Sequence, residues 1–504
     1  MRLLTLFLAG SVVYLNGCVS PEAQQAHQSA KPNIVFITVD DLGIMDVGAY
    51  NPDCFYETPN IDRFAASAMR FNRAYVSSPV CSPSRYTLMT GKYPSRVHAT
   101  DWFVGTRSGH FLPAEIIDRM PLEEITIAEL LKGAGYATGF IGKWHLGPSQ
   151  EFYPQNQGFD LNQGGHHRGG PYTGGEYFSP FEMPELKPDS PPGEHLPDRL
   201  ARETAAFIEA NKDRPFLACL NFYSVHTPLM GRPDLVERYG EKAKAVEGVE
   251  FGKEEYVTFY HKGKKKLHSE PYRPVRILQK HAIYAAMVEA MDEAVGLVLQ
   301  QLETLGLAEN TIVIVTSDHG GLSTKEGTPT SNVPFRGGKG WLYEGGIRVP
   351  FIIRYPGVTS LEQVYEEPVS TLDLYSTLAA AADAPIHHEI DGVDLAPALA
   401  GGAIERGPLY WHYPHYSNQG GFPSGAALIG DKKLIQRYED GGVHLYDLSE
   451  DISEQNDIAA EHPKLVEQMT AHLHGWLHSQ DARFLRQRPE AGSPKPWRPS
   501  YFKP

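Results

Sequence analysis

The stretch IVFITVDD at residues 34–41 decides the expected fold, because an apolar, β-branched run ends there directly in two aspartates. Continuous apolar runs of this length are typical of parallel strands that are buried on both faces of a sheet. Four more runs have the same character: ATGFIG at 137–142, FLACLNF at 216–222, TIVIVT at 311–316 and VPFIIR at 349–354. We therefore expect an α/β fold with a large, mainly parallel central sheet flanked by helices.

Polar and ionisable residues follow four of these runs. In open α/β sheets, ligands bind at the carboxyl ends of the strands, so side chains that follow different strands meet at one edge. The residues expected at this edge are Asp40, Asp41, Lys143, His145, His226, Asp318 and His319. The sequence thus predicts one site that is built from segments far apart in the chain.

The pattern changes near residue 400. Alternating segments at 427–436 and 443–447, joined by the turn EDGG at 439–442, indicate an antiparallel sheet. A helix at 463–479 would cover one face of it, and the tail, with five prolines between 489 and 504, is typical of an extended strap. We expect a main domain at 32–400, with a long helix at 283–305, and a smaller C-terminal α+β subdomain at 401–504.

The composition excludes several classes of protein. Of 504 residues, 41% are hydrophobic and 21% are charged, which suits a buried core and argues against a disordered chain or a small disulfide-stapled scaffold. Lysine plus arginine number 46 against 61 aspartates plus glutamates, a net charge of −15. Because nucleic-acid binders need clustered cations, this balance excludes a general nucleic-acid partner. An anionic ligand must instead meet a local basic pocket.

The first residues have the pattern of an export signal. Met1 and Arg2 precede an apolar run at 3–15 that is too short to span a bilayer. Leu15 and Gly17 ahead of Cys18 resemble a bacterial lipobox, whose cysteine is acylated. We expect a lipoprotein signal peptide at 1–17, a tether at 18–31, and a periplasmic or cell-surface protein that meets the membrane only through a lipid on Cys18. Simple secretion is the alternative.

The stretch CSPSRYTLMTG at residues 81–91 has the signals of a short helix. Ser82 suits the cap, Pro83 the first helical position and Gly91 the stop. Cys81 would then lie at the positive end of the helix, which favours an anion or a deprotonated nucleophile. Taken alone, the stretch could equally be an ordinary helix cap after a chance cysteine.

The same stretch resembles the signature of the type I sulfatases, a family of the alkaline phosphatase superfamily, at every defining position: Cys-x-Pro-x-Arg followed by Thr-Gly. The resemblance implies that a maturation enzyme oxidises Cys81 to formylglycine, whose hydrated aldehyde is the nucleophile. Cys81 is then neither a thiol catalyst nor half of a disulfide. Cys219, within an apolar run, fits a buried inert thiol, and Cys54 stays unassigned.

The resemblance extends to a metal site. Asp40, Asp41, Asp318 and His319 match its ligands, which together with the oxygen on residue 81 imply one calcium ion. Clustered carboxylates suit such a hard cation. An asparagine would be the plainer oxygen ligand at position 319, so the metal's identity stays open.

The family's other site residues also have counterparts here. The segment GKWHLG at 142–147 implies that Lys143 clamps a sulfate oxygen and that His145 acts on residue 81. Arg85, one helical turn after the cysteine, would orient the modified side chain and neutralise charge beside it.

Two more counterparts would act on the leaving group and the sulfate. His226 aligns with the histidine near the leaving-group oxygen, and Lys339, in GGKG at 337–340, with a second sulfate-binding lysine. Lys325 is close to Lys339 in sequence and is the alternative.

The expected activity is hydrolysis of sulfate esters, with 32–400 as the catalytic domain and a sulfated polysaccharide or oligosaccharide as substrate. Loops that combine aromatic with cationic or titratable residues suit such a sugar: Trp102, Arg107 and His110, GGHHRGG at 164–170, and WHYPHY at 411–416. Two alternatives remain, a phosphonate or phosphate ester hydrolase of the same superfamily and a non-catalytic surface lipoprotein that binds glycans.

Overall fold

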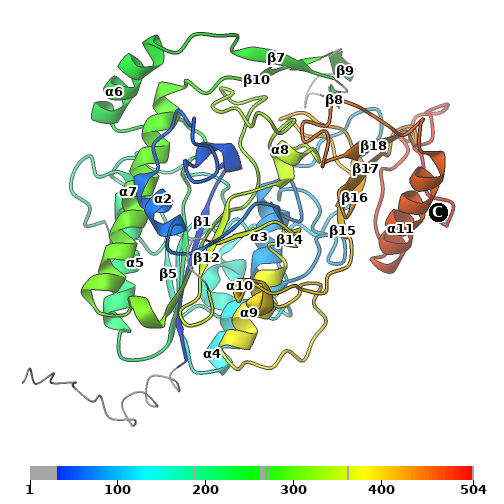
Figure 1. The fold of residues 1–504 in the computed structure, drawn as a ribbon. Coiled ribbons are helices and arrows are strands. Elements are labelled where there is room, and N and C mark those ends of the chain that lie inside the picture. Colours follow the sequence, from blue (N-terminus) through cyan, green and yellow to red (C-terminus); the bar gives the residue numbers. More distant parts are fainter. Residues whose placement is uncertain are drawn as a thin grey trace, which may run out of the picture. The chain divides into compact units, whose positions relative to one another are not determined.

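An eight-stranded sheet lies at the centre of the fold in this computed structural model, which describes residues 31–501 except 187, 256, 261–266, 271 and 360–362 (Figure 1). The strand order is β13-β2-β12-β11-β1-β6-β4-β5. Its parallel centre consists of β1 (Asn33–Val39), β4 (Ala137–Gly142), β6 (Phe216–Asn221) and β11 (Thr311–Ser317), with β5 (Leu161–Gln163) beside β4. The predicted mainly parallel sheet is confirmed.

The fifth predicted run differs in direction. It forms β12 (Phe351–Arg354), which runs antiparallel to both β11 and β2 (Met69–Phe71), while β13 (Gln363–Tyr365) is parallel to β2. A parallel return would need a crossover to the other end of the sheet. The connection from β11 to β12 instead contains only the four-residue helix α8 (Glu344–Ile347) and brings Lys339 to the site, so β12 starts at the same edge and runs back.

Helices cover both faces of the sheet (Figure 1). On one face, Val35, Ile37 and Val39 of β1 belong to the apolar core of α2 (Pro59–Ala65), α5 (Leu196–Ala210), α6 (Pro233–Lys244) and α7 (Ala282–Thr304). On the other, Ile34 and Phe36 belong to the core of α3 (Cys81–Thr90), α4 (Ile127–Gly133), α9 (Asp373–Ala381) and α10 (Ala396–Leu399). This burial on both faces is why the strand is apolar throughout. The long helix predicted at 283–305 is α7.

A second, antiparallel sheet follows near the C-terminus, as predicted. Its strands are β15 (Leu409–Tyr413), β16 (Ser424–Ile429), β17 (Lys432–Arg437) and β18 (Val443–Asp447), and α11 (Pro463–Ser479) packs on it. The segment 427–436 is not one strand, because a turn at Gly430, with φ +59°, separates β16 from β17. An apolar cluster that includes Tyr75 of the short strand β3 (Ala74–Tyr75) and Trp341 of the connection between β11 and β12 also contains Trp411 and Ile435, so the two parts share a core. The boundary near residue 400 stays a prediction.

Short elements complete the described chain. Between α6 and α7, the chain forms β7 (Phe251–Glu254), β8 (Val257–Tyr260), β9 (Leu267–Glu270) and β10 (Arg273–Arg276), and β3 (Ala74–Tyr75) pairs with β14 (Val369–Ser370). Four 3-10 turns are Ile44–Asp46, Gln150–Phe152, Pro154–Asn156 and Ala308–Asn310.

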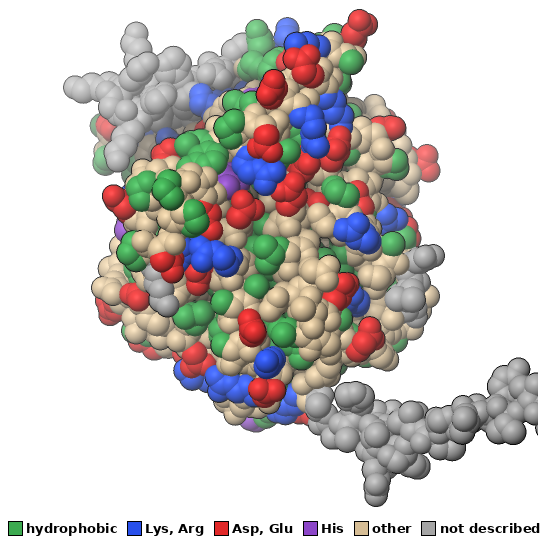
Figure 2. All heavy atoms as spheres, turned by 90° about the vertical axis from the view of Figure 1, so that its left-hand side faces the viewer, with side chains coloured by type: hydrophobic (Ala, Val, Ile, Leu, Met, Phe, Trp, Pro, Cys, Tyr) green, Lys and Arg blue, Asp and Glu red, His purple; other side chains and the backbone are tan. Residues whose placement is uncertain are grey.

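The face turned toward the viewer in Figure 2 mixes acidic and basic side chains. Elsewhere in the described chain, ion pairs such as Arg232 with Glu293 at 2.6 Å and Lys242 with Glu57 at 2.7 Å likewise bring the two signs together. Such a face offers no uniformly basic surface to a polyanion.

None of the helices in the described part of the chain is long and apolar enough to cross a bilayer. The predicted signal peptide at 1–17, with Cys18 and the tether up to residue 30, lies outside the described residues.

Candidate active site

The register of the central strands brings the predicted polar residues to one edge. Val39 at the end of β1 lies opposite Ser317 of β11, and Asn221 of β6 lies opposite both Thr38 and Gly142. The residues that come next in each segment, among them Asp40, Lys143 and Asp318, are therefore neighbours. The convergence expected from the sequence is present in the structure.

Helix α3 presents Cys81 to this edge as its first residue. Val80 precedes the helix without a side-chain cap, so the prediction that Ser82 is the cap and Pro83 the first helical residue is wrong. The Ser82 hydroxyl instead accepts a hydrogen bond from the Phe103 amide at 3.1 Å, because the helix start is buried and this loop packs on it. Gly91 ends the helix in the left-handed region at φ +66°, as predicted.

Three carboxylates lie around Cys81, and each has a cationic partner. Asp40 accepts a hydrogen bond from Lys143 Nζ. Asp41 Oδ1 accepts from Lys339 Nζ at 2.7 Å, and Asp318 Oδ2 accepts from Arg85 Nε at 2.8 Å. The six side chains are at most 3% exposed. Three negative charges are thus balanced by three positive ones in a buried site, where unpaired charge would be costly.

His319 points its Nε2 atom into the same cluster. This atom lies 3.2 Å from Asp41 Oδ1, 3.4 Å from Asp318 Oδ1 and 3.4 Å from Cys81 Sγ. Nδ1 lies 3.0 Å from the Gly320 carbonyl oxygen, so its proton is donated there and Nε2 faces the carboxylates. Burial alone would lower the pKa of His319, but Asp318, Cys81 and Asp41 raise it to about 9.

The donor set suits a cation. Asp40, Cys81, Asp318 and His319 each offer one atom, and these atoms all lie within 4.8 Å of one another. Asp40 Oδ1 is buried without a hydrogen-bond partner, and burial together with the charge of Asp318 raises the pKa of this carboxyl well above its usual range. Arg85 Nη2 lies 3.8 Å from this oxygen, which is beyond hydrogen-bond distance. These residues therefore fit a hard, divalent metal ion.

The electrostatics also favour an anion at position 81. Burial alone would raise the pKa of the Cys81 thiol, yet Lys143, Lys339 and His319 hold it well below its ordinary value. A position that stabilises a thiolate this strongly will also stabilise other anionic groups, such as the oxygens of an ester.

Two histidines flank residue 81 as neutral bases. Burial lowers the pKa of His145 to about 4, and burial with the charge of Lys339 lowers that of His226 to about 3. The His226 Nδ1 proton goes to the Thr227 carbonyl at 2.7 Å, which leaves Nε2 without a proton in the free site.

Two residues at this edge have a strained backbone. Asp41 and His145 both have left-handed φ angles, 62° and 59°, which residues other than glycine seldom adopt. Gly142, at φ +100°, precedes Lys143 where an added Cβ would lie 1.9 Å from the Asn221 carbonyl oxygen. Only glycine fits this position, and its turn delivers Lys143 and His145 to the site.

A cavity of about 230 Å³ opens above Cys81. Its lining consists of Cys81, Trp102, Arg107, His145, Gly169, Tyr172, His226, Thr227, Glu326, Lys339, Asn418 and Gln419. Trp102, Arg107 and Gly169 belong to loops that the sequence had indicated. Lys339 lines the cavity, and Lys325 does not.

Other residues proposed from the sequence lie elsewhere. His110 Nδ1 lies 3.2 Å from a Glu439 oxygen, and Trp411 is buried, with its indole N–H donating to the Val76 carbonyl at 2.7 Å. These side chains pack or pair within the fold. The cavity residues that the sequence did not indicate are Tyr172, Thr227, Glu326, Asn418 and Gln419. Tyr172 closely follows the glycine-rich segment at 164–170 in sequence, and this closeness was the signal from which Tyr172 could have been proposed as a site residue.

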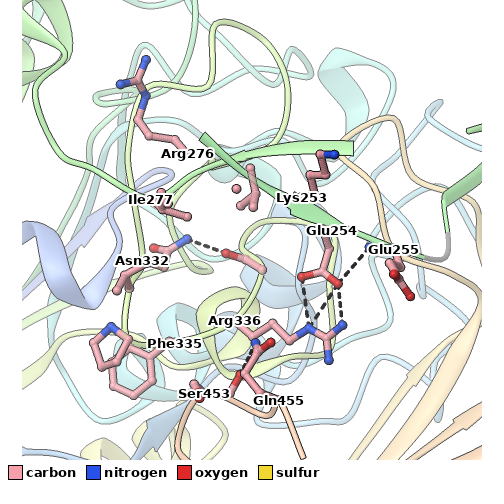
Figure 3. A pocket seen from close by; sticks show the side chains of 15 residues that line it. Lys253, Glu254, Glu255, Arg276, Ile277, Asn332, Phe335, Arg336, Ser453 and Gln455 are labelled. Carbon is pink, nitrogen blue, oxygen red and sulfur yellow. Dashed lines mark hydrogen bonds and ion pairs between the residues drawn. The ribbon is translucent and has the colours of Figure 1, made fainter. Parts of the chain in front are cut away.

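A larger cavity of about 630 Å³ lies elsewhere, between the paired strands β7 and β10 and the loops at 332–337 and 453–455 (Figure 3). Figure 3 shows the Arg336 guanidinium facing the Glu254 carboxylate, and their closest atoms are 2.6 Å apart. No nucleophile with a neighbouring base lies among its described lining residues. The chemistry therefore belongs to the smaller cavity above Cys81.

Comparisons with known proteins agree with this geometry. The family model described as Sulfatase matches residues 32–384, and the model described as N-sulphoglucosamine sulphohydrolase, C-terminal, matches 337–482. The chain is 31% identical over 533 residues to a sulfatase of Formosa agariphila, with 90% of each chain covered. It is 32% identical to N-acetylgalactosamine-6-sulfatase of Sus scrofa, covering 76% of this chain and 68% of the relative, and 31% identical to human steryl-sulfatase, covering 75% and 71%.

Solved structures share the fold. Ps i-CgsB in complex with k-i-k-neocarrahexaose has a TM-score of 0.70 at 27% identity, covering 89% of this chain and 93% of that one. A protein in complex with its substrate D-glucosamine-2-N,6-O-disulfate has a TM-score of 0.69 at 22% identity, with coverages of 90% and 98%.

Proposed function

The chain belongs to the sulfatase family and is a sulfuric ester hydrolase, and on this premise we propose that it removes sulfate from a sulfated carbohydrate, with formylglycine at position 81 beside a calcium ion. The observation that carries the proposal is the charge arrangement around residue 81. Three cations and three carboxylates, all buried, surround the first residue of α3, at the base of a cavity that is open to a ligand.

The charge balance explains how a sulfate ester would bind. With the carboxylates already neutralised by Lys143, Lys339 and Arg85, a divalent ion would leave the site with a surplus of two positive charges. The residues that would hold it are Asp40, Asp41, Asp318 and His319, and the calcium ion would neutralise charge on the ester oxygens. Preorganised positive charge of this kind is commonly the largest contribution to catalysis of an anionic transfer.

Formylglycine would supply a hydrated aldehyde with two hydroxyls, one to attack sulfur and one to release sulfate afterwards. The chain's own residues fix and deprotonate this group. Arg85 lies one turn along α3 from residue 81, and its Nη1 donates a hydrogen bond to the Lys143 carbonyl oxygen at 2.8 Å. The backbone that follows β4 therefore fixes the position of the Arg85 side chain. His145 lines the cavity beside residue 81 and is neutral, as a base that removes a hydroxyl proton must be.

His226 is the candidate for proton transfer to the leaving oxygen. Its Nδ1 is held by Thr227, so Nε2 is the atom that exchanges a proton with the ligand. In the free site, burial and the charge of Lys339 keep the pKa of the His226 imidazole low. A bound anionic ester would add negative charge next to this ring and so favour its protonated form. Lys339 lines the same cavity, its charge acts on His226, and it is a second candidate for this role.

A carbohydrate substrate is supported by the cavity lining and by the relatives. Thr227, Glu326, Asn418 and Gln419 offer hydrogen-bonding groups suited to sugar hydroxyls. The names of relatives such as N-acetylgalactosamine-6-sulfatase and the complex with neocarrahexaose point the same way. We further propose that the chain is exported, lipid-anchored at Cys18 to a bacterial membrane, and matured by a formylglycine-generating enzyme.

The test is mass spectrometry of the peptide that contains residue 81, from protein produced together with a maturation enzyme. The expected result is an aldehyde in place of the thiol, and calcium-dependent sulfate release from sulfated oligosaccharides. Active protein with an intact Cys81 sulfur would overturn the proposal. So would the absence of sulfate release from protein that carries the aldehyde and bound calcium.

A further inference from the structure

The cavity above Cys81 contains an arginine that nothing in the chemistry at sulfur uses. Arg107 lines the cavity on the loop that also carries Trp102. Across residues 31–501, outside the gaps named above, no hydrogen bond or ion pair engages its guanidinium, and its Nε is buried without a partner. Guanidinium groups that lose water without gaining a partner are costly, and they pair best with carboxylate or sulfate-like anions.

The same lining contains an acidic group. Glu326 is the one acidic residue among the described residues that line the cavity. Its Oε1 accepts hydrogen bonds from Asn418 Nδ2 at 2.5 Å and from Gln419 Nε2 at 3.0 Å. These amides hold the carboxylate from the C-terminal loop, and no ion pair between Glu326 and Arg107 is present among the described residues. The cavity therefore presents an anion-binding group and an acceptor of hydroxyl protons at separate positions.

The size of the cavity limits what can enter. A volume of about 230 Å³ is below the roughly 300–1,000 Å³ of pockets that enclose a drug-sized molecule. The Trp102 ring lies 6.5 Å from that of His145 and the Tyr172 ring 6.4 Å from that of His226, so an aromatic side chain lies next to each of the two site histidines in the lining. A cavity of this size suits a single sugar residue with its substituents rather than a longer oligosaccharide.

From these observations we infer that the cavity takes one sugar residue that carries a second anionic substituent besides the sulfate to be removed, and that Arg107 binds this second group. The inference rests on the proposed function, since the scissile sulfate must lie at residue 81. Glu326 would accept hydroxyl protons of the same residue and would repel an anionic substituent at its own position. The ligand chemistry is a sulfated monosaccharide unit with a further sulfate or a carboxylate.

The experiment uses full-length matured protein and a chemically sulfated mixture of glucose and galactose, which contains singly and doubly sulfated species at all positions. Mass spectrometry follows the loss of each species in one reaction, so the preference for doubly over singly sulfated sugar is an internal ratio. The wild type should prefer the doubly sulfated species. Arg107→Ala should reduce this ratio about tenfold or more, as expected for loss of a charge-assisted hydrogen bond, and Arg107→Lys should restore part of it.

Lys325→Ala is the matched control, because it removes an exposed cation from the loop that contains Glu326 without altering the cavity lining. It should leave the ratio unchanged. An aryl sulfate, which has no second anion, reports on the chemistry alone. The inference is wrong if the wild type cleaves the aryl sulfate but consumes no sulfated hexose, or if it shows no preference for the doubly sulfated sugar. It is also wrong if Arg107→Ala keeps the wild-type preference for the doubly sulfated sugar. If matured wild type cleaves neither probe, the proposed function fails instead.

Discussion

Lys339 Nζ donates to Asp41 Oδ1 at 2.7 Å across 298 residues of sequence, and this contact joins the connection after β11 to the end of β1. Lys339 is 3% exposed and lines the cavity above Cys81, whereas Lys325 is exposed to solvent. The structure thus separates the two lysines that the sequence left as alternatives.

Lys339→Met should lower kcat/KM for an aryl sulfate by about 10²–10³, the range seen when one preorganised donor to a developing anion is removed. The variant loses a cation at the cavity wall and leaves Asp41 without its partner. Lys325→Met is the matched control and should keep wild-type kinetics. A Lys339→Met enzyme that stays folded and fully active would contradict the role given to this residue.

Removing calcium should abolish turnover and lower the thermal unfolding temperature together. Without the ion, Asp40 keeps a buried, unpartnered oxygen beside Asp318, so the folded state loses a stabilising ligand. The measurement is thermal unfolding and aryl sulfate turnover after chelation, followed by titration with Ca²⁺ or Mg²⁺. Ca²⁺ should restore both properties at lower concentration, because Mg²⁺ demands a stricter octahedral geometry. Full activity after exhaustive chelation would be incompatible with the proposed site.

The ends of the strands could be predicted from the sequence, and the walls of the cavity could not. Apolar runs identify buried parallel strands, and the residues after them must then share an edge, which places Asp40, Lys143 and Asp318. Glu326 and Asn418 come from irregular loops 92 residues apart, and no local pattern specifies their contact. It depends on how the C-terminal sheet packs against the main one.

A buried ion cluster at that junction gives a stability prediction. Lys433 of β17 lies 2.9 Å from Glu344 and 2.8 Å from Glu454, and all three side chains are fully buried. Lys433→Met should lower the free energy of unfolding by about 3–5 kcal/mol, because it leaves two buried carboxylates without their shared cation. The preceding residue provides the control. Lys432 pairs with Asp447 at 2.6 Å but is 35% exposed, so Lys432→Met should cost about 0–1 kcal/mol. Equal losses in chemical denaturation of the two variants would refute this account.

The same cluster should make stability depend on pH. Burial, and then the charge of Glu344, raises the pKa of Glu454 from its ordinary 4.5 to about 7, although Lys433 opposes the shift. Between these two values the unfolded chain has released a proton that the folded chain still holds. Raising the pH across this window therefore lowers the free energy of unfolding, and the contribution is fully present only below pH 4.5.

Glu454→Gln cannot titrate, so its unfolding free energy should fall less between pH 4.5 and 7.5 than that of the wild type, by on the order of 2 kcal/mol. Glu450→Gln, which removes an exposed carboxylate four residues earlier, should keep the wild-type slope. Denaturant unfolding at a series of pH values measures all three, and a Glu454→Gln slope as steep as the wild type's would show that this carboxyl is ionised throughout the window.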